Sequence, residues 1–157
     1  MIEPEQLAYL HGVLDAAGVE YAFITHSAHL ASADDGVQYG LGTLGEMAPT
    51  LLLKTGPDFR LAILGGDRRL SYKKIKKHLH LRDVALASPE QVRRLTGAEP
   101  GSVSLVNPGL PTLVDAALPP HAHVYGGTGL PGHTLRITVS DLIAVTGAEV
   151  FDFSEEK

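Results

Sequence analysis

The chain has 157 residues, 44% of them hydrophobic and 20% charged, which is ordinary for one globular domain. It contains no cysteine, which excludes disulfides, thiolate nucleophiles and cysteine-based zinc sites. The formal net charge of −5 lacks the overall basic excess that is usual in nucleic-acid-binding domains. The first residues have neither the basic start nor the apolar run of a signal peptide, and no stretch approaches the roughly 20 apolar residues that span a bilayer. We therefore expect a single soluble, cytoplasmic domain over residues 1–157.

The first third of the sequence predicts a helix, a strand and a second helix. Leucines at 3–4 residue spacing predict an amphipathic helix over about 3–17, with Gly18 where a helix would end. The segment 21–25 is typical of a strand. Ser32 is suited to cap a short helix, and the glycines at 40–45 then break regular structure.

The middle of the sequence predicts a β-hairpin followed by a basic helix. The apolar runs 50–53 and 60–64 read as strands, and Gly56-Pro57-Asp58 between them has turn chemistry. Ser71 is a suitable cap for a helix that continues to about Leu79.

The second half alternates short strands with capped helices. Ser88-Pro89-Glu90-Gln91 is a strong helix start that combines a serine cap, proline at the first position and a capping-box glutamine. Ser140 is expected to cap a last helix that ends at Gly147. Further strands are expected at 84–86, 113–115, 123–125, 134–137 and 149–153. Without strict alternation, this order predicts an α+β fold: a mixed, largely antiparallel sheet with flanking helices.

Basic residues gather in one short segment, although the whole chain is acidic. Seven of the 13 Lys and Arg lie between positions 68 and 82, with no acid among them: Arg68, Arg69, Lys73, Lys74, Lys76, Lys77 and Arg82. Clustered lysines bind nucleic-acid phosphates independently of base sequence, but a charge run is often only a solvated helix face. The segment is compatible with either role.

A collinear set of segments resembles one known family. The segments are Leu95-Thr96-Gly97, Pro100-Gly101-Ser102-Val103-Ser104, Leu110 to Asp115, Tyr125-Gly126-Gly127 and Ser140 to Val150. They resemble the YbaK and prolyl-tRNA synthetase editing domain family. The hairpin at 50–64 and the helix at 70–79 fit the same order, so the resemblance covers nearly the whole chain, most weakly over 28–48.

The resemblance implies a trans-editing aminoacyl-tRNA deacylase that contributes to translation fidelity. Such an enzyme hydrolyses the ester between a wrong amino acid (Ala, Cys, Ser or similar) and the terminal ribose of a tRNA. It implies no metal or other cofactor, and a water or the substrate's own thiol oriented by glycine-rich loops in place of a protein nucleophile. The implied partners are the misacylated acceptor end of tRNA and an aminoacyl-tRNA synthetase, and neither DNA nor a membrane.

Three groups of site residues follow from this resemblance. The expected catalytic donors are backbone N–H groups of Gly101, Gly126 and Gly127, because glycine lets a backbone approach a ligand closely. The expected substrate-binding residues are Thr50, Ser104, His26 and Asp115. The expected tRNA-binding residues are Arg68, Arg69, Lys73, Lys76 and Lys77. His26 is equally suited to a turn, and Asp115 to a strand end.

Two positions depart from the family pattern. Pro49 stands where the family has a lysine before Thr-Leu, and Leu105 stands where it has a proline. Lys54 is further along the same strand, roughly 13 Å from Thr50, and is no replacement for that lysine. The alternative function is therefore a catalytically inactive module of the same fold that binds tRNA, a synthetase or a small amino-acid derivative. A cleft filled by Leu105 or Tyr125 would favour this alternative.

The eight histidines do not form a metal-binding pattern. The pairs His78/His80 and His121/His123 have a two-residue spacing, which places both side chains on one face only in a strand. No His-Glu-x-x-His sequence or carboxylate-completed set accompanies them. The sequence therefore predicts no metal ligands.

Overall fold

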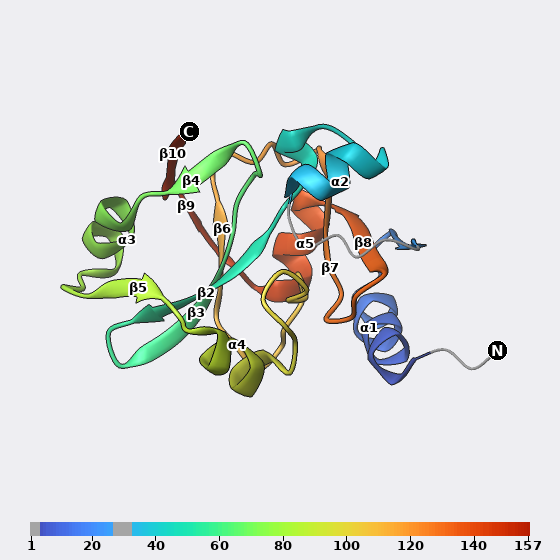
Figure 1. Cartoon of the computed structure of the whole chain (residues 1–157), viewed down its shortest axis with the longest axis horizontal. Helices are drawn as coiled ribbons and strands as arrows, with labels where there is room; N and C mark the ends of the chain where they lie inside the picture. The colour runs from blue at the N-terminus through green and yellow to red at the C-terminus, as the bar shows by residue number, and fades with distance from the viewer. Residues whose placement is uncertain (1–3, 27–32) are drawn as a thin grey trace.

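A five-stranded mixed sheet forms the centre of the computed structural model, which describes residues 4–26 and 33–157 (Figure 1). The strand order is β5-β2-β3-β6-β9. Strands β2 and β3 form the predicted hairpin, β5 is antiparallel to β2, and β3, β6 and β9 run parallel. The bounds are β2 (Thr50–Thr55), β3 (Asp58–Ile63), β5 (Val84–Leu86), β6 (Thr112–Asp115) and β9 (Glu149–Phe151). The predicted mixed sheet is confirmed.

Helices cover both faces of this sheet. Ile75 of α3 (Tyr72–Leu79) is buried with Leu53 on one face, and Val92 of α4 (Pro89–Thr96) is buried with Leu52 on the other. Both helices begin as predicted, because the Ser71 hydroxyl accepts from the Lys74 N–H and Ser88 forms a capping box with Gln91. Adjacent β2 residues thus point into separate cores, as the two-residue period of a strand requires.

A second sheet has three antiparallel strands in the order β1-β8-β7. Their bounds are β1 (Tyr21–Thr25), β7 (His123–Gly127) and β8 (His133–Thr138). Leu10 and Leu14 of α1 (Glu5–Ala16) are buried against Leu135 and Ile137 of β8. The predicted first helix is confirmed, and its spaced leucines cover one face of this small sheet.

The remaining elements include a third, two-stranded sheet in which β10 (Ser154–Glu156) pairs with β4 (Arg68–Leu70). The others are α2 (Ala33–Tyr39), the 3-10 turn η1 (Leu44–Glu46) and α5 (Val139–Thr146). Ser32, the expected cap of α2, lies outside the described residues. Within those residues, no helix is long and apolar enough to cross a bilayer.

Two predictions about the C-terminal segment are wrong. The cap of α5 is Thr138 and not Ser140, since the Thr138 hydroxyl accepts from the Asp141 N–H at 3.2 Å. The expected single strand over 149–153 is instead two strands in different sheets, because β10 leaves the central sheet and pairs with β4. Strand β4 carries part of the basic segment, and its partner is distant in sequence, so no local pattern predicted this pairing.

Candidate functional site

A cavity of about 210 Å³ lies where the start of β2 approaches β7. The backbone joins the two sheets here, because Ala48 N–H donates to the Tyr125 carbonyl at 2.9 Å. The walls come from segments 47–51, 101–103, 125–127 and 130–134, with His26 and residues of α2 completing them. The volume far exceeds the need of one water and is smaller than that of a drug-sized ligand site, so the cavity suits a small group.

Glycine backbone forms one wall because the chain segments are too close for side chains. A β-carbon on Gly127 would lie 3.0 Å from the Ser102 carbonyl oxygen and overlap the carbonyl of Val103. The loop is held there by hydrogen bonds from Leu105 N–H to the Gly127 carbonyl (3.0 Å) and from Gly129 N–H to the Ser102 carbonyl (2.8 Å). Two glycine-containing segments that are far apart in sequence therefore present main chain to the same space.

Leu105, the residue in place of the family's proline, does not fill the cavity. Its side chain is fully buried in the core with Leu10 and Leu135. The side chain lies directly under Gly126, where an added β-carbon would be 2.6 Å from both Leu105 methyl carbons. Tyr125 forms part of the wall and leaves the cavity open. The Leu105 side chain therefore packs against Gly126 from the side of the core and supports the glycine wall.

Two polar side chains of the cavity stand out by their hydrogen bonding. His26 is buried, and its ring Nε2 is 2.9 Å from the Thr134 hydroxyl. The backbone N–H of His26 donates to the Gly132 carbonyl. The Thr50 hydroxyl is buried and has no hydrogen-bond partner among the described residues. An unpaired buried hydroxyl costs roughly 1–3 kcal/mol. The oxygen itself is closed to solvent, so a ligand in the cavity could pair with it only after a local rearrangement of the wall.

The cavity is otherwise uncharged. Among the described residues, no Lys, Arg, Asp or Glu lines it, and its titratable side chains are His26, His133 and Tyr125. Pro49 takes its place in the wall at the position of the family's lysine. Lys54 lies four residues after Thr50 on β2, where its side chain is exposed and is not part of the wall. Fixed backbone dipoles, rather than a cation, must therefore act on a bound ligand.

The structure brings most of the expected catalytic and substrate-binding residues together. Those that line the cavity are Thr50, Gly101, Gly126, Gly127 and His26. Ser104 does not line it, because its hydroxyl accepts from the Val106 N–H at 3.1 Å and its backbone bridges to Gly127. Its place in the structure is that of a residue that shapes the loop.

Asp115 lies outside the cavity, in contrast to the expectation that it contacts substrate. Its carboxylate is fully buried, accepts from the Phe153 N–H at 3.2 Å and from the Ser154 hydroxyl, and lies 3.9 Å from Arg68 Nε. These contacts join the end of β6 to the chain that enters β10. The alternative interpretation, a strand-end residue, agrees with this position.

Several cavity residues were not expected from the sequence. Ser102, Met47 and Thr134 line the wall beside the expected glycines. Ser102 neighbours Gly101 in a loop of small residues, and this composition was a usable signal. Thr134 was found only through the β7–β8 register, which pairs it with Gly127.

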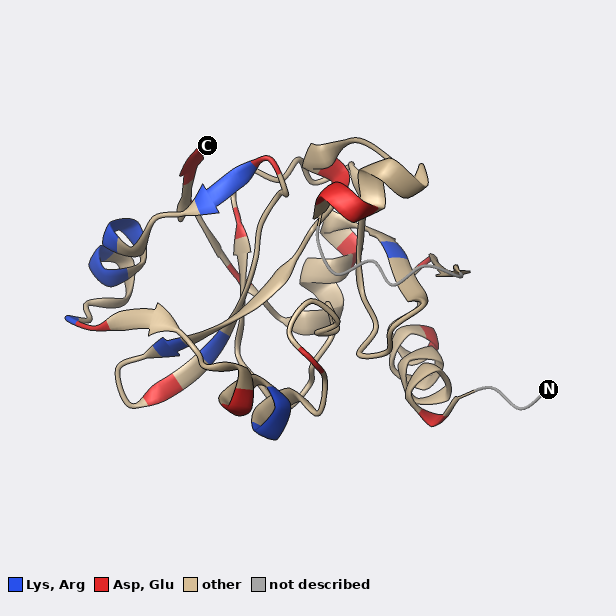
Figure 2. Ribbon diagram, viewed as in Figure 1, with Lys and Arg blue, Asp and Glu red and all other residues tan. Residues whose placement is uncertain are grey.

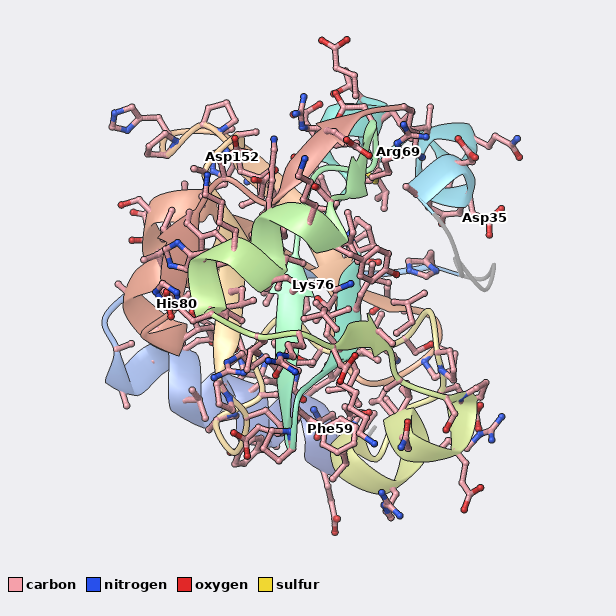
Figure 3. All side chains as sticks on the ribbon, turned by 90° about the vertical axis from the view of Figure 1, so that its left-hand side faces the viewer. Asp35, Phe59, Arg69, Lys76, His80 and Asp152 are labelled. Atoms are coloured by element: carbon pink, nitrogen blue, oxygen red, sulfur yellow. The ribbon has the colours of Figure 1, made fainter. Side chains whose placement is uncertain are left out.

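Helix α3 of the basic cluster lies at the end of the molecule away from the cavity, whereas β4 begins two residues after Gly66, whose N–H donates to the carbonyl of Met47 in the cavity wall at 2.7 Å. Figure 2 shows α3 and β4 in blue on the side opposite β7 and α2, and Figure 3 turns this end toward the viewer, with Arg69 and Lys76 labelled. Arg69 pairs with Glu155 at 3.1 Å, while Arg68 donates to Ser154 and lies near Asp115. The two expected tRNA-binding arginines therefore hold β4 to β10.

Three lysines of the cluster differ from these arginines. Lys73, Lys76 and Lys77 have no ion pair with any described residue, whereas Lys74 pairs with Asp152 at 3.0 Å. The hydrogen bond from Lys74 lowers the pKa of Asp152 below its ordinary value. Only the three unpaired lysines thus offer uncompensated positive charge on α3.

Comparison with known proteins agrees with this fold. The family model of the aminoacyl-tRNA editing domain matches residues 27–145. A proline–tRNA ligase of Moorella thermoacetica is 36% identical to this chain in an alignment of 99 residues. The match covers 59% of this chain and 17% of the ligase. The chain thus spans less than a fifth of that relative's length.

Two solved structures share the fold over nearly all of both chains. The hypothetical protein APE2540 superimposes with a TM-score of 0.86 and 25% identity, covering 96% of this chain and 100% of the other. A protein described as a candidate trans-editing enzyme for prolyl-tRNA synthetase gives a TM-score of 0.84 and 26% identity, covering 98% and 99%. With the match over residues 27–145, this chain belongs to the aminoacyl-tRNA editing domain family.

Proposed function

We propose that this protein is a trans-editing deacylase that hydrolyses the ester linking a small amino acid to the terminal ribose of tRNA. The observation that carries the proposal is the open cavity of about 210 Å³ walled by glycine backbone, with the unpaired Thr50 hydroxyl buried in its wall. Its size favours a small aminoacyl group such as Ala, Ser or Cys. The three unpaired lysines of α3 would contact phosphates of the tRNA body.

The chemistry needs a positioned water and donors for the developing oxyanion. The water oxygen attacks the ester carbonyl carbon, and negative charge develops on the carbonyl oxygen. In the wall at 101–103 the Ser102 N–H already donates to the Glu99 carbonyl, and Gly126 and Gly127 are engaged in strand pairing. The N–H groups of Gly101 and Val103 would therefore stabilise that charge. The bond to the ribose oxygen then breaks, the ribose oxygen takes up the proton released by water, and free amino acid and tRNA leave.

Single-turnover deacylation of tRNAs charged with Ala, Ser, Cys, Thr and Pro tests this proposal against spontaneous ester loss without enzyme. We expect faster release from one or two of these tRNAs. Release at the spontaneous rate across the whole panel would contradict the proposal. If deacylation appears only in the Pro49→Lys variant, the natural protein is a non-catalytic binding module.

Replacing Thr50 with valine tests the role of the unpaired hydroxyl. Valine copies the shape of threonine and removes the hydroxyl, so we expect the free energy of unfolding to stay constant or to rise by about 1 kcal/mol. Deacylation should fall about tenfold, as expected for the loss of one hydrogen bond to the bound substrate. Thermal unfolding and single-turnover rates measure the two effects, and unchanged rates would mean that Thr50 is only part of the wall.

A further inference from the structure

Arg136 extends the sheet face that forms the cavity. Thr134 lines the cavity, and Arg136 follows two residues later on β8, so the two side chains point to the same face. The register pairs Arg136 with Tyr125, another residue of the cavity wall, and Arg136 Nε donates to the Tyr125 hydroxyl at 3.3 Å. One hydrogen bond therefore separates this guanidinium from the wall of the cavity.

The guanidinium of Arg136 is not neutralised by an ion pair. Arg68, Arg69 and Arg93 each lie within 4.0 Å of a carboxylate, whereas Arg136 has no carboxylate at that distance in the part of the chain that the structure describes. Glu46 is near enough to interact electrostatically with Arg136, but it does not form an ion pair with the guanidinium. Arg136 therefore holds a fixed position without a direct carboxylate partner among the described residues, which suits an anionic ligand.

A surface groove continues from Arg136 away from the cavity. Arg136 and His123 both line it, together with residues of α1 and β1. His123 precedes Tyr125 by two residues on β7, so it lies on the same face, one further step of about 6.6 Å along the strand. The row Thr134, Arg136, His123 thus leads from the cavity into the groove. On β1, Ala22 lies opposite Arg136 and leaves room beside the guanidinium.

Three carboxylates also face this region. Glu46 accepts hydrogen bonds from the Thr43 N–H and hydroxyl at 2.8 and 2.9 Å, and these bonds lower its pKa, with smaller contributions from Arg136 and His123. Asp15 and Glu20 line the groove at its α1 and β1 side, where Asp15 accepts from the Tyr21 hydroxyl. Asp15 and Glu20 therefore repel an anion at the far edge of the groove, and Glu46 offsets part of the positive charge of Arg136 and His123 beside β7.

We propose that Arg136, with His123 beside it, binds the phosphates of the 3′-terminal nucleotides of tRNA while the aminoacyl ester occupies the cavity. The terminal ribose carries both the ester and, a few bonds away, its own 5′-phosphate, so an ester in the cavity brings that phosphate to the adjacent surface. Arginine binds phosphate with paired, charge-assisted hydrogen bonds. Arg136 would thus supply from β8 the cation that is absent at Pro49. This inference rests on the proposed function.

The test compares two substrates that share the ester but differ in phosphate. One is the aminoacyl-tRNA hydrolysed fastest in the panel, and the other is the matching 3′-aminoacyl adenosine without phosphate. For Arg136→Gln we expect KM for the tRNA to rise about tenfold with kcat little changed, and KM for the adenosine ester to stay constant. Arg136→Lys should recover part of the loss. Arg94→Gln removes an equal charge from the exposed surface of α4 and should leave KM for both substrates unchanged.

The results distinguish direct binding of phosphate by Arg136 from a role in holding Tyr125 in place. An equal rise in KM for both substrates would mean that Arg136 only holds Tyr125 in the cavity wall. An unchanged KM for the tRNA would mean that Arg136 binds no phosphate. Either result overturns the inference. If the natural protein hydrolyses neither substrate, the proposed function fails separately. Binding of a short CCA-ended oligoribonucleotide, measured by fluorescence anisotropy, then decides: Arg136→Gln should weaken it and Arg94→Gln should not, and equal affinity in all three proteins overturns the inference.

Discussion

Replacing Gly127 with alanine is expected to abolish deacylation and to lower the free energy of unfolding by about 1–3 kcal/mol, the usual cost of overpacking. The added methyl group would overlap the Val103 carbonyl and lie 3.0 Å from the Ser102 carbonyl oxygen. Since these atoms are main chain, the loop at 101–103 must move away from β7. Both walls of the cavity would then lose their spacing. Single-turnover rates and chemical denaturation measure the two effects.

Gly109 provides the matched control for this substitution. A β-carbon there meets no atom within 4 Å, and the residue does not have a positive φ. Gly109→Ala should therefore retain both stability and deacylation. If Gly127→Ala is as active as Gly109→Ala, the glycine backbone does not form the reactive wall.

Replacing Asp115 with alanine is expected to destabilise the protein by about 3 kcal/mol while leaving the activity of the folded protein unchanged. The substitution removes an acceptor from the buried Phe153 N–H and the Ser154 hydroxyl, and unpaired buried donors cost about 1–3 kcal/mol each. It also leaves Arg68 without its nearest carboxylate. Chemical denaturation measures the loss, and deacylation well below the unfolding midpoint measures activity.

Asp152 is a suitable control because it pairs with Lys74 on the surface, where its side chain is 64% exposed. Surface ion pairs contribute little to stability, so Asp152→Ala should destabilise far less than Asp115→Ala. A lower kcat of the Asp115→Ala protein under conditions in which it is fully folded would mean that Asp115 takes part in the reaction. A loss of stability alone would establish Asp115 as the link between β6 and β10.

The positions of the glycine-rich segments were predictable, but their meeting was not. Gly101 and Gly126 belong to segments that resemble the editing family, and both line the cavity. Asp115 stands in an equally similar segment, yet its side chain points to the β10 side. The direction of a side chain at a strand end depends on the neighbouring strands, which the local sequence does not specify.

The elements with local causes were predicted correctly. Ser71 and Ser88 cap their helices, and the turn at 56–58 joins β2 to β3. Strand β10 was missed, because its pairing with β4 joins residues more than 80 positions apart. The same pairing brings carboxylates close to Arg68 and Arg69, so only Lys73, Lys76 and Lys77 of the five expected residues have no ion pair with a described residue.

The sequence by itself determined the caps of α3 and α4, the hairpin, the absence of thiol chemistry and the likeness to the editing family. These depend on residues close together in the chain or on composition. Only the tertiary structure decided that Leu105 lies in the core, that the cavity stays open and uncharged, and that Arg136 reaches its wall. The physical reason is that a cavity and an unpaired charge are properties of long-range contacts, which form between segments that no local pattern connects.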